Sequence, residues 1–271
     1  MSSDLDYVDH MVRDSDRFAE VLLTADPMKP VPSCPDWTTI DLFWHLTEVQ
    51  WFWGAVVRER ADDPHALTTP QPERPTDLDS LGHLYATVSA GLEDVLRDVP
   101  PDTPVWTWAD DKSVAFIRRR QAHEALIHRV DAELTVGKDS DIDPALATDG
   151  IDEVLRVMFA GVPDWGSFEA DGSKVRIETS DTGAGWTVVL GRFTGTDPDD
   201  GKEYDEVGLE VVDDAGADDA GADDAVDATV RGLAADLDCW LWGRLAAEGV
   251  DRKGDETVLA RLQSMIGSGI N

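Results

Sequence analysis

The apolar residues of this chain change their spacing near residue 140, and that change restricts the folds available to it. Before residue 140 they recur at steps of three and four, as in the set Leu5, Val8, Val12, Ala19 and Leu22. Such a stripe is typical of an amphipathic helix. After residue 140, strand-like apolar runs are separated by Gly and Asp. We therefore predict an α+β protein of two domains, of which the first is helical.

Four helices are predicted for the first domain, residues 1–140. The second of them runs through TTIDLFWHLTEVQWFWGAVVRE, and Thr38 with Asp41 can form a capping box at its start. The third lies in LDSLGHLYATVSAGLEDVLRDV, and the fourth contains RRRQAHEALIHRVDAE. Pro-rich segments of unequal length separate these helices. Four helices with connections of mixed length suggest a four-helix bundle.

Residues 141–271 are predicted to form a smaller α+β domain. A helix in PALATDGIDEVLRVMFAG precedes strands in SKVRIETSD, GWTVVLGRF, EVGLEVVDD and DATVRG, and another helix follows in LAADLDCWLWGRLAAEG. The five-residue repeat DDAGADDAGADDA, residues 213–225, has no large apolar residue to bury. We predict that this repeat is an acidic mobile loop between two strands.

The formal net charge of −33 excludes several classes of partner. So acidic a surface repels nucleic acid and anionic membranes. It is typical of solubility in a salt-rich, halophilic cytoplasm, with an acidic docking surface as the alternative. The chain has no long apolar run and no signal-peptide pattern, and its two cysteines make no disulfide framework. These features predict a cytoplasmic protein.

The fourth predicted helix contains a candidate pair of metal ligands. Glu124 and His128 are one turn apart on the same face, and Asp131 continues that face. His123 points about 100° away, so it is assigned to packing or to support of a ligand. Charged residues on the opposite side are expected to face water; they are Arg118, Arg119, Arg129 and Glu133. Glu124 is therefore expected to face the bundle interior.

An interior carboxylate needs a partner of opposite charge. A metal ion shared with His128 is one solution for Glu124, and an arginine is another. His45 of the second helix offers a third ligand, because it shares a face with apolar residues; they are Leu42, Val49, Phe52 and Val56. Three ligands leave positions open, as in catalytic metal sites, and Asp131 or Glu48 could orient a ligand. The alternative is that His45 is a hydrogen-bonded core residue.

Three segments together resemble a known family. VPSCPDWTTIDLFWHLTEV, VAFIRRRQAHEALIHRVDAE and DATVRGLAADLDCWLWGRL are similar, in this order, to blocks of the mycothiol-dependent maleylpyruvate isomerase family, within the DinB-like metalloproteins. The resemblance implies a DinB-like four-helix bundle followed by a smaller α+β domain. It also implies metal ligands at His45, Glu124 and His128. Zinc suits these ligands best, while nickel, iron and manganese are alternatives.

The resemblance further implies chemistry with a low-molecular-weight thiol such as mycothiol. A divalent metal would hold the thiol as thiolate, which can add to a double bond or displace a leaving group. We therefore expect a metal- and thiol-dependent isomerase or S-transferase that acts on a small electrophilic substrate, as a monomer or homodimer. The alternative is a non-catalytic metal-binding module with a regulatory or binding role.

A few further residues are of chemical types that suit this chemistry. Arg231, in TVRG, is interpreted either as a catalytic residue that binds a carboxylate or as a surface strand residue. Cys34 is expected to pack rather than to act as a nucleophile, because no base lies beside it in the sequence. Most of the ten tryptophans are expected to fill the cores, with an aromatic wall near the metal as the alternative.

Overall fold

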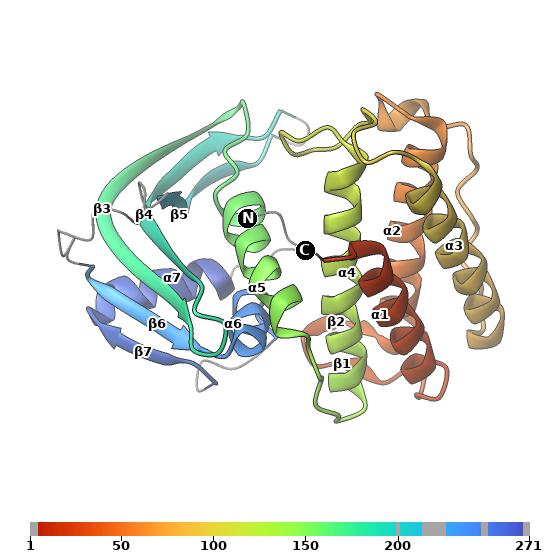
Figure 1. Cartoon of the computed structure of the whole chain (residues 1–271), viewed down its shortest axis with the longest axis horizontal. Helices are drawn as coiled ribbons and strands as arrows, with labels where there is room; N and C mark the ends of the chain where they lie inside the picture. The colour runs from red at the N-terminus through yellow and green to blue at the C-terminus, as the bar shows by residue number, and fades with distance from the viewer. Residues whose placement is uncertain (1–4, 199–200, 213–225, 245–248, 268–271) are drawn as a thin grey trace. The chain divides into compact units, whose positions relative to one another are not determined.

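The chain divides into two compact units, Met1–Asp141 and Ile142–Asn271 (Figure 1). The structure is a computed structural model that describes residues 5–198, 201–212, 226–244 and 249–267. The first unit is helical and the second is α+β, which confirms the predicted fold class. The acidic repeat at 213–225 lies outside the described residues. None of the described helices combines the length and hydropathy needed to cross a membrane.

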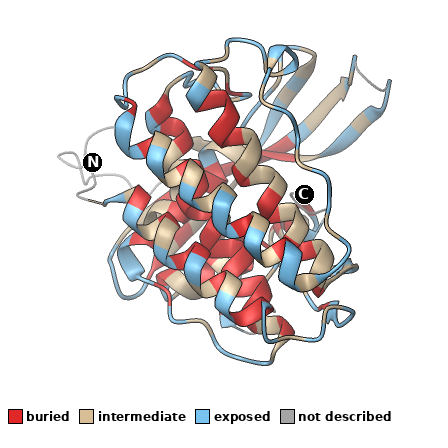
Figure 2. Ribbon diagram, turned by 90° about the vertical axis from the view of Figure 1, so that its right-hand side faces the viewer, coloured by how far each residue is buried: buried red, intermediate tan, exposed pale blue. Residues whose placement is uncertain are grey.

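Four long helices build the first unit: α1 Tyr7–Leu22, α2 Thr39–Glu59, α3 Leu78–Asp98 and α4 Val114–Thr135. The Pro-rich segment before α2 was predicted only as a break, but it forms an antiparallel pair of short strands, β1 Pro30–Val31 and β2 Cys34–Thr38. A 3₁₀ turn, η1 Pro64–Ala66, interrupts the connection between α2 and α3. Figure 2 shows the buried residues of this unit where the helices meet and the exposed ones along their outer faces.

The helices pack as two parallel pairs. Asp14 contacts Arg129 and Arg17 contacts Glu133, so α1 and α4 run in the same direction. The rings of Phe43 and Tyr85 lie 5.1 Å apart, and Gly54 packs against Leu92, so α2 and α3 are also parallel. A parallel neighbour requires a long crossover, which explains the extended connection between Glu59 and Leu78. The resulting bundle places α4 beside both α1 and α2.

The start of α2 is fixed by the predicted capping box. Asp41 accepts hydrogen bonds from the amide of Thr38 at 2.9 Å and from its hydroxyl at 2.5 Å. These bonds, together with Arg74 at 2.6 Å, outweigh the effect of burial and lower the pKa of Asp41 to about 2. The box sets the first turn of the helix that carries His45.

We expect Asp41→Ala to lower the free energy of unfolding by about 1 kcal/mol near neutral pH. The pKa of Asp41 falls on folding from 3.8 to about 2, so its stabilisation is present above 3.8 and is lost as the pH falls through 2. The difference in free energy of unfolding between wild type and variant, measured by urea denaturation, should therefore decrease as the pH falls from 3.8 to about 2. The exposed Asp36→Ala on β2 is the control. A gap that does not depend on pH would contradict this account.

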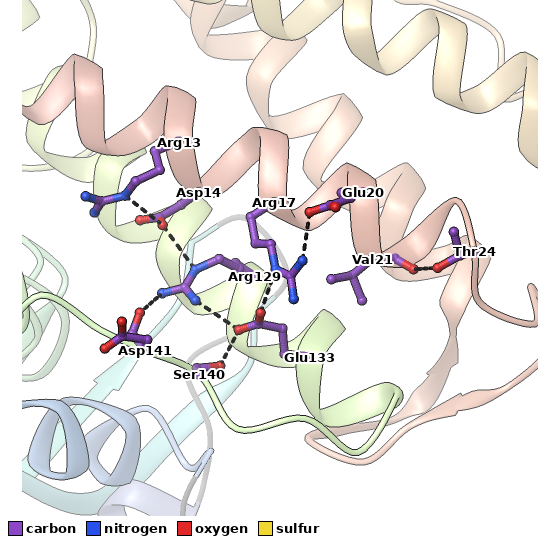
Figure 3. A network of polar contacts seen from close by, with 10 residues as sticks. All are labelled: Arg13, Asp14, Arg17, Glu20, Val21, Thr24, Arg129, Glu133, Ser140 and Asp141. Atoms are coloured by element: carbon purple, nitrogen blue, oxygen red, sulfur yellow. Dashed lines mark hydrogen bonds and ion pairs between the residues drawn. The ribbon is translucent and has the colours of Figure 1, made fainter.

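The charged side of α4 does not face water, contrary to the prediction. Arg129 and Glu133 are 5% and 3% exposed, and Arg118 and Arg119 are partly buried. The helical wheel assumed one wet side, whereas α4 is buried on most of its surface. Figure 3 shows Arg129 between Asp14 of α1 and Glu133, so its charge is compensated inside the unit. Arg129 and Glu133 are thus buried because neighbouring elements pack against this side of α4, although both side chains are charged.

The second unit contains a five-stranded sheet in the order β5-β4-β3-β6-β7. Its strands are β3 Gly166–Thr179, β4 Gly185–Thr196, β5 Glu203–Val212, β6 Ala228–Gly232 and β7 Asp251–Gly254. β3 and β6 are parallel, and the other neighbours are antiparallel. The helices of this unit are α5 Pro144–Glu153, α6 Ala234–Leu241 and α7 Glu256–Gly267. Its core combines sheet and helix residues, among them Val175, Ile177, Leu190, Val230, Leu237, Trp240 and Leu262.

Several predicted elements of this unit differ from the structure. One helix was predicted across residues 144–161. The structure has the α-helix α5 only as far as Glu153, and a π-helical turn, η2, follows over Val154–Phe159. The helix predicted from residue 233 ends at Leu241, and Gly243 follows with a left-handed φ of 71°. β7 and α7 were not predicted. All four residues of β7 are exposed, so the strand has no alternating apolar pattern to reveal it.

Candidate metal centre

Three side chains from two helices converge in the first unit. His45 of α2 and Glu124 and His128 of α4 each offer a ligand atom, and these atoms lie within 4.8 Å of one another. Glu124 Oε1 is 3.5 Å from His45 Nε2 and 3.2 Å from His128 Nε2. The side chains of His45, Glu124 and His128 are 32%, 19% and 9% exposed. His45 is thus less buried than its apolar stripe suggested, and the site has an accessible side.

His128 is held from behind by a buried carboxylate. Its Nδ1 lies 2.9 Å from Asp131 Oδ2, and Asp131 is fully buried. A hydrogen bond at Nδ1 leaves the Nε2 lone pair free for a cation, as in carboxylate–histidine–metal arrangements. Asp131 therefore takes one of the two orienting positions that the sequence suggested. The other candidate, Glu48, instead accepts a hydrogen bond from Gln71 at 2.8 Å.

The β1–β2 segment supports both imidazoles. Ser33 donates a hydrogen bond to Asp131 Oδ1 at 2.5 Å, and Cys34 Sγ lies 4.0 Å from the same carboxylate. The ring of Trp37 lies 4.6 Å from that of His45 and 6.3 Å from that of His128. Sequence reasoning did not connect Ser33 or Trp37 with the site. Their position depends on how the strand pair packs against α4, which no local pattern encodes.

Glu124 also has a buried arginine partner. Arg120, one turn earlier on α4, lies 3.0 Å from Glu124 Oε2, and its side chain is 5% exposed. The sequence left two alternatives as the partner of Glu124, a metal ion shared with His128 and an arginine. The structure places Arg120 beside Glu124 and also brings together the three side chains that could hold an ion. The i, i+4 spacing of Arg120 and Glu124 was visible in the sequence, but the burial of Arg120 was not.

The surroundings favour the charged forms of the acidic and basic groups. Burial alone would raise the pKa of Glu124, but hydrogen bonds from His128 and His45 and the charge of Arg120 hold it well below its ordinary value. Burial would lower the pKa of His128, and its bonds to Asp131 and Glu124 overcome this and raise it to about 9. The site therefore favours the ionised form of Glu124 with a positive charge beside it.

Comparisons with known proteins show the family of the chain. The family model of the mycothiol maleylpyruvate isomerase N-terminal domain matches residues 8–133, and that of the MDMPI C-terminal domain matches residues 145–261. The chain belongs to the mycothiol maleylpyruvate isomerase family. The resemblance inferred from three sequence segments is thereby confirmed.

Two solved structures have the same fold as this chain. The crystal structure of the mycothiol-dependent maleylpyruvate isomerase superimposes with a TM-score of 0.57 at 15% identity, over 94% of this chain and 97% of that one. A structure of that isomerase with a histidine-to-alanine substitution gives a TM-score of 0.59 at 14% identity, with the same coverage. No curated protein sequence matches the chain.

The other residues singled out in the sequence are not among the three candidate ligands. Arg231 is exposed on β6 of the second unit, in register with Glu178 of β3 and Asp251 of β7. His123 is fully buried, with its ring centroid 6.3 Å from that of Tyr7. Of the tryptophans, Trp53 stacks on Trp106 with 6.0 Å between their ring centroids. Trp37 lies beside the imidazoles of His45 and His128.

We expect Asp131→Asn to weaken metal binding by about 10–100-fold, the usual effect of removing a carboxylate behind a ligand histidine. The amide presents either its oxygen or its NH₂ group to His128 Nδ1, so the imidazole loses its fixed orientation and some of its basicity. The affinity is measured by competition with a chelator. Asp94→Asn, which alters an exposed carboxylate on α3 of the same unit, is the control. Equal affinities of wild type and Asp131→Asn would contradict this role.

Proposed function

We propose that this protein is a divalent-metal- and low-molecular-weight-thiol-dependent isomerase or S-transferase that acts on a small electrophilic substrate. Its metal ligands would be His45, Glu124 and His128, with zinc the best match to two imidazoles and a carboxylate. The observation that carries the proposal is the convergence of these three ligand atoms. Membership of a family with mycothiol-dependent isomerases among its solved structures supports the reaction class.

The spacing of the ligand atoms fits a single ion. Two ligands that are each about 2.1 Å from a tetrahedral metal are about 3.4 Å apart. The distances from Glu124 Oε1 to the Nε2 atoms of His128 and His45 are 3.2 and 3.5 Å. All three ligand atoms lie within 4.8 Å of one another, so a bound ion would draw the two imidazoles closer together. Three protein ligands would leave at least one position for a thiol.

The protein groups around this position have definable tasks. A bound divalent metal supplies the charge that keeps a thiol sulfur deprotonated near neutral pH. Asp131 fixes the tautomer of His128, and Trp37 provides an apolar surface beside both imidazoles. The partial exposure of His45 and Glu124 leaves a side from which small molecules can approach. We also propose that Arg231 binds a carboxylate of the substrate or the thiol.

Metal analysis and thiol titration test the proposal. Protein purified without chelator should contain about one divalent ion per chain, and the His45→Ala/His128→Ala variant should contain none. The controls are His65→Ala and His83→Ala, which alter exposed histidines. Mycothiol should then change the visible spectrum of the cobalt-substituted protein.

The outcomes separate the two candidate functions. Absence of metal from the wild type, or its retention in the double variant, would refute the metal centre. Metal binding without any spectral response to mycothiol or cysteine would refute thiol-dependent chemistry. The chain would then be a metal-binding module.

A further inference from the structure

The two oxygens of Glu124 have different partners. Oε1 faces the Nε2 atoms of His45 and His128 at 3.5 and 3.2 Å, whereas Oε2 lies 3.0 Å from Arg120 Nη2. A carboxylate can bind a metal through one oxygen or through both. The division of partners at Glu124 directs only one oxygen toward the imidazoles.

We propose that Arg120 is a positioning residue that holds Glu124 as a one-oxygen ligand and keeps a coordination position open for an anionic sulfur. The inference rests on the metal centre proposed above and adds a residue to it. Neither the family match nor the helical wheel singled out Arg120.

The burial of Arg120 is what makes the arrangement rigid. Its side chain is 5% exposed, and a guanidinium taken out of water must keep a counter-charge. If Glu124 rotated Oε2 toward the imidazoles, the bond to Arg120 would break and leave that charge without this partner. The i, i+4 spacing on one helix fixes the distance between the two residues independently of other elements. Glu124 is therefore restrained to present Oε1.

The restraint has a chemical consequence at the open side. While Glu124 Oε2 is bound to Arg120, it does not coordinate the ion. The coordination position that it would otherwise fill remains available to a thiol. The positive charge of Arg120 also offsets the negative charge of Glu124, which reduces repulsion between the carboxylate and a thiolate. Since Arg120 is buried and occupied by Glu124, its role differs from the carboxylate binding proposed for the exposed Arg231.

The coordination of cobalt in Arg120 variants tests this inference. We expect cobalt-substituted Arg120→Met to bind the metal through both oxygens of Glu124, and its visible absorption to weaken because the coordination number rises. Binding of mycothiol, followed by the same absorption, should weaken by about tenfold or more, the size of effect seen for groups behind metal ligands. Arg120→Lys, which retains the charge, should recover part of both properties.

Arg118→Met is the matched control, because Arg118 lies on the same helix and donates to the backbone carbonyl of Val99 at 2.9 Å. Its cobalt spectrum should match that of the wild type. An Arg120→Met protein that binds cobalt with the wild-type spectrum and thiol affinity would overturn the inference while leaving the proposed function intact. A wild type that binds no cobalt would overturn both.

A folding defect in Arg120→Met would not prevent the test. Arg120→Gln is less disruptive because it keeps a polar side chain, but it removes the charge and the reach of the guanidinium. X-ray absorption of its zinc form reports the number of bound oxygen and nitrogen atoms. An increase by one oxygen relative to the wild type supports the inference, and an unchanged shell contradicts it.

Discussion

Glu124→Gln should abolish high-affinity metal binding. The substitution keeps the shape of the side chain and removes the only negative charge among the three proposed ligands, His45, Glu124 and His128. We expect the affinity to fall by more than about 100-fold, the upper end for groups that merely support a ligand. The loss should also leave the buried Arg120 without the carboxylate 3.0 Å away. Chelator competition measures the affinity.

The control for this prediction is Glu48→Gln. Glu48 lies on α2 near His45, but its carboxylate accepts a hydrogen bond from Gln71 rather than facing the imidazoles. Its substitution should leave metal affinity within about twofold of the wild type, as for a residue outside the site. If Glu124→Gln binds metal as tightly as Glu48→Gln, Glu124 is not a ligand.

Arg129→Met should strongly destabilise the helical unit. Arg129 lies 3.0 Å from Asp14 and 2.9 Å from Glu133, and both carboxylates are at most 5% exposed (Figure 3). Burial already raises the pKa of Asp14 despite its arginine partners. Removing Arg129 takes away the buried partner of Asp14 and Glu133 and leaves these carboxylates to the more exposed Arg13 and Arg17. Breaking a buried ion pair typically costs about 3–5 kcal/mol. The free energy of unfolding is measured by urea denaturation, with the helical circular dichroism signal as probe.

Two further variants separate burial from charge. Arg17→Met alters an arginine that also contacts Glu133 but is 34% exposed, so its cost should be no more than about 1 kcal/mol. Asp14→Asn combined with Arg129→Met removes a charge of each sign and should recover part of the stability lost in the single variant. Equal costs for Arg17→Met and Arg129→Met would show that burial of the pair is unimportant.

This network also connects α4 to the end of the first unit. Ser140 donates to Glu133 at 2.7 Å, and Arg129 donates to the carbonyl of Asp141 at 3.0 Å. The residue next to His128 is thus anchored both to α1 and to the segment that follows α4. We infer that the network restricts the rotation of α4 and so contributes to the orientation of its two candidate ligands.

The sequence by itself determined the features that depend on residues within a few positions of one another. The spacing of apolar residues distinguished the helical part from the α+β part, and the fold class is confirmed. The capping box of Thr38 and Asp41 formed as predicted. The placement of Glu124, His128 and Asp131 on one face of α4 followed from the 3.6-residue period alone. Local geometry is enough for such features because the regular helix fixes the relative directions of side chains that are close in sequence.

Only the tertiary structure decided which side chains are removed from water. A wheel cannot tell that α4 has a neighbour on the side of Arg129 and Glu133, so these charges were wrongly expected to face solvent. It cannot show that a strand pair brings Trp37 against His45, or that Arg120 is buried beside Glu124. Burial changes the free energy of a charge far more than helix position does, because it replaces water by protein. The surroundings of the candidate site therefore had to come from packing.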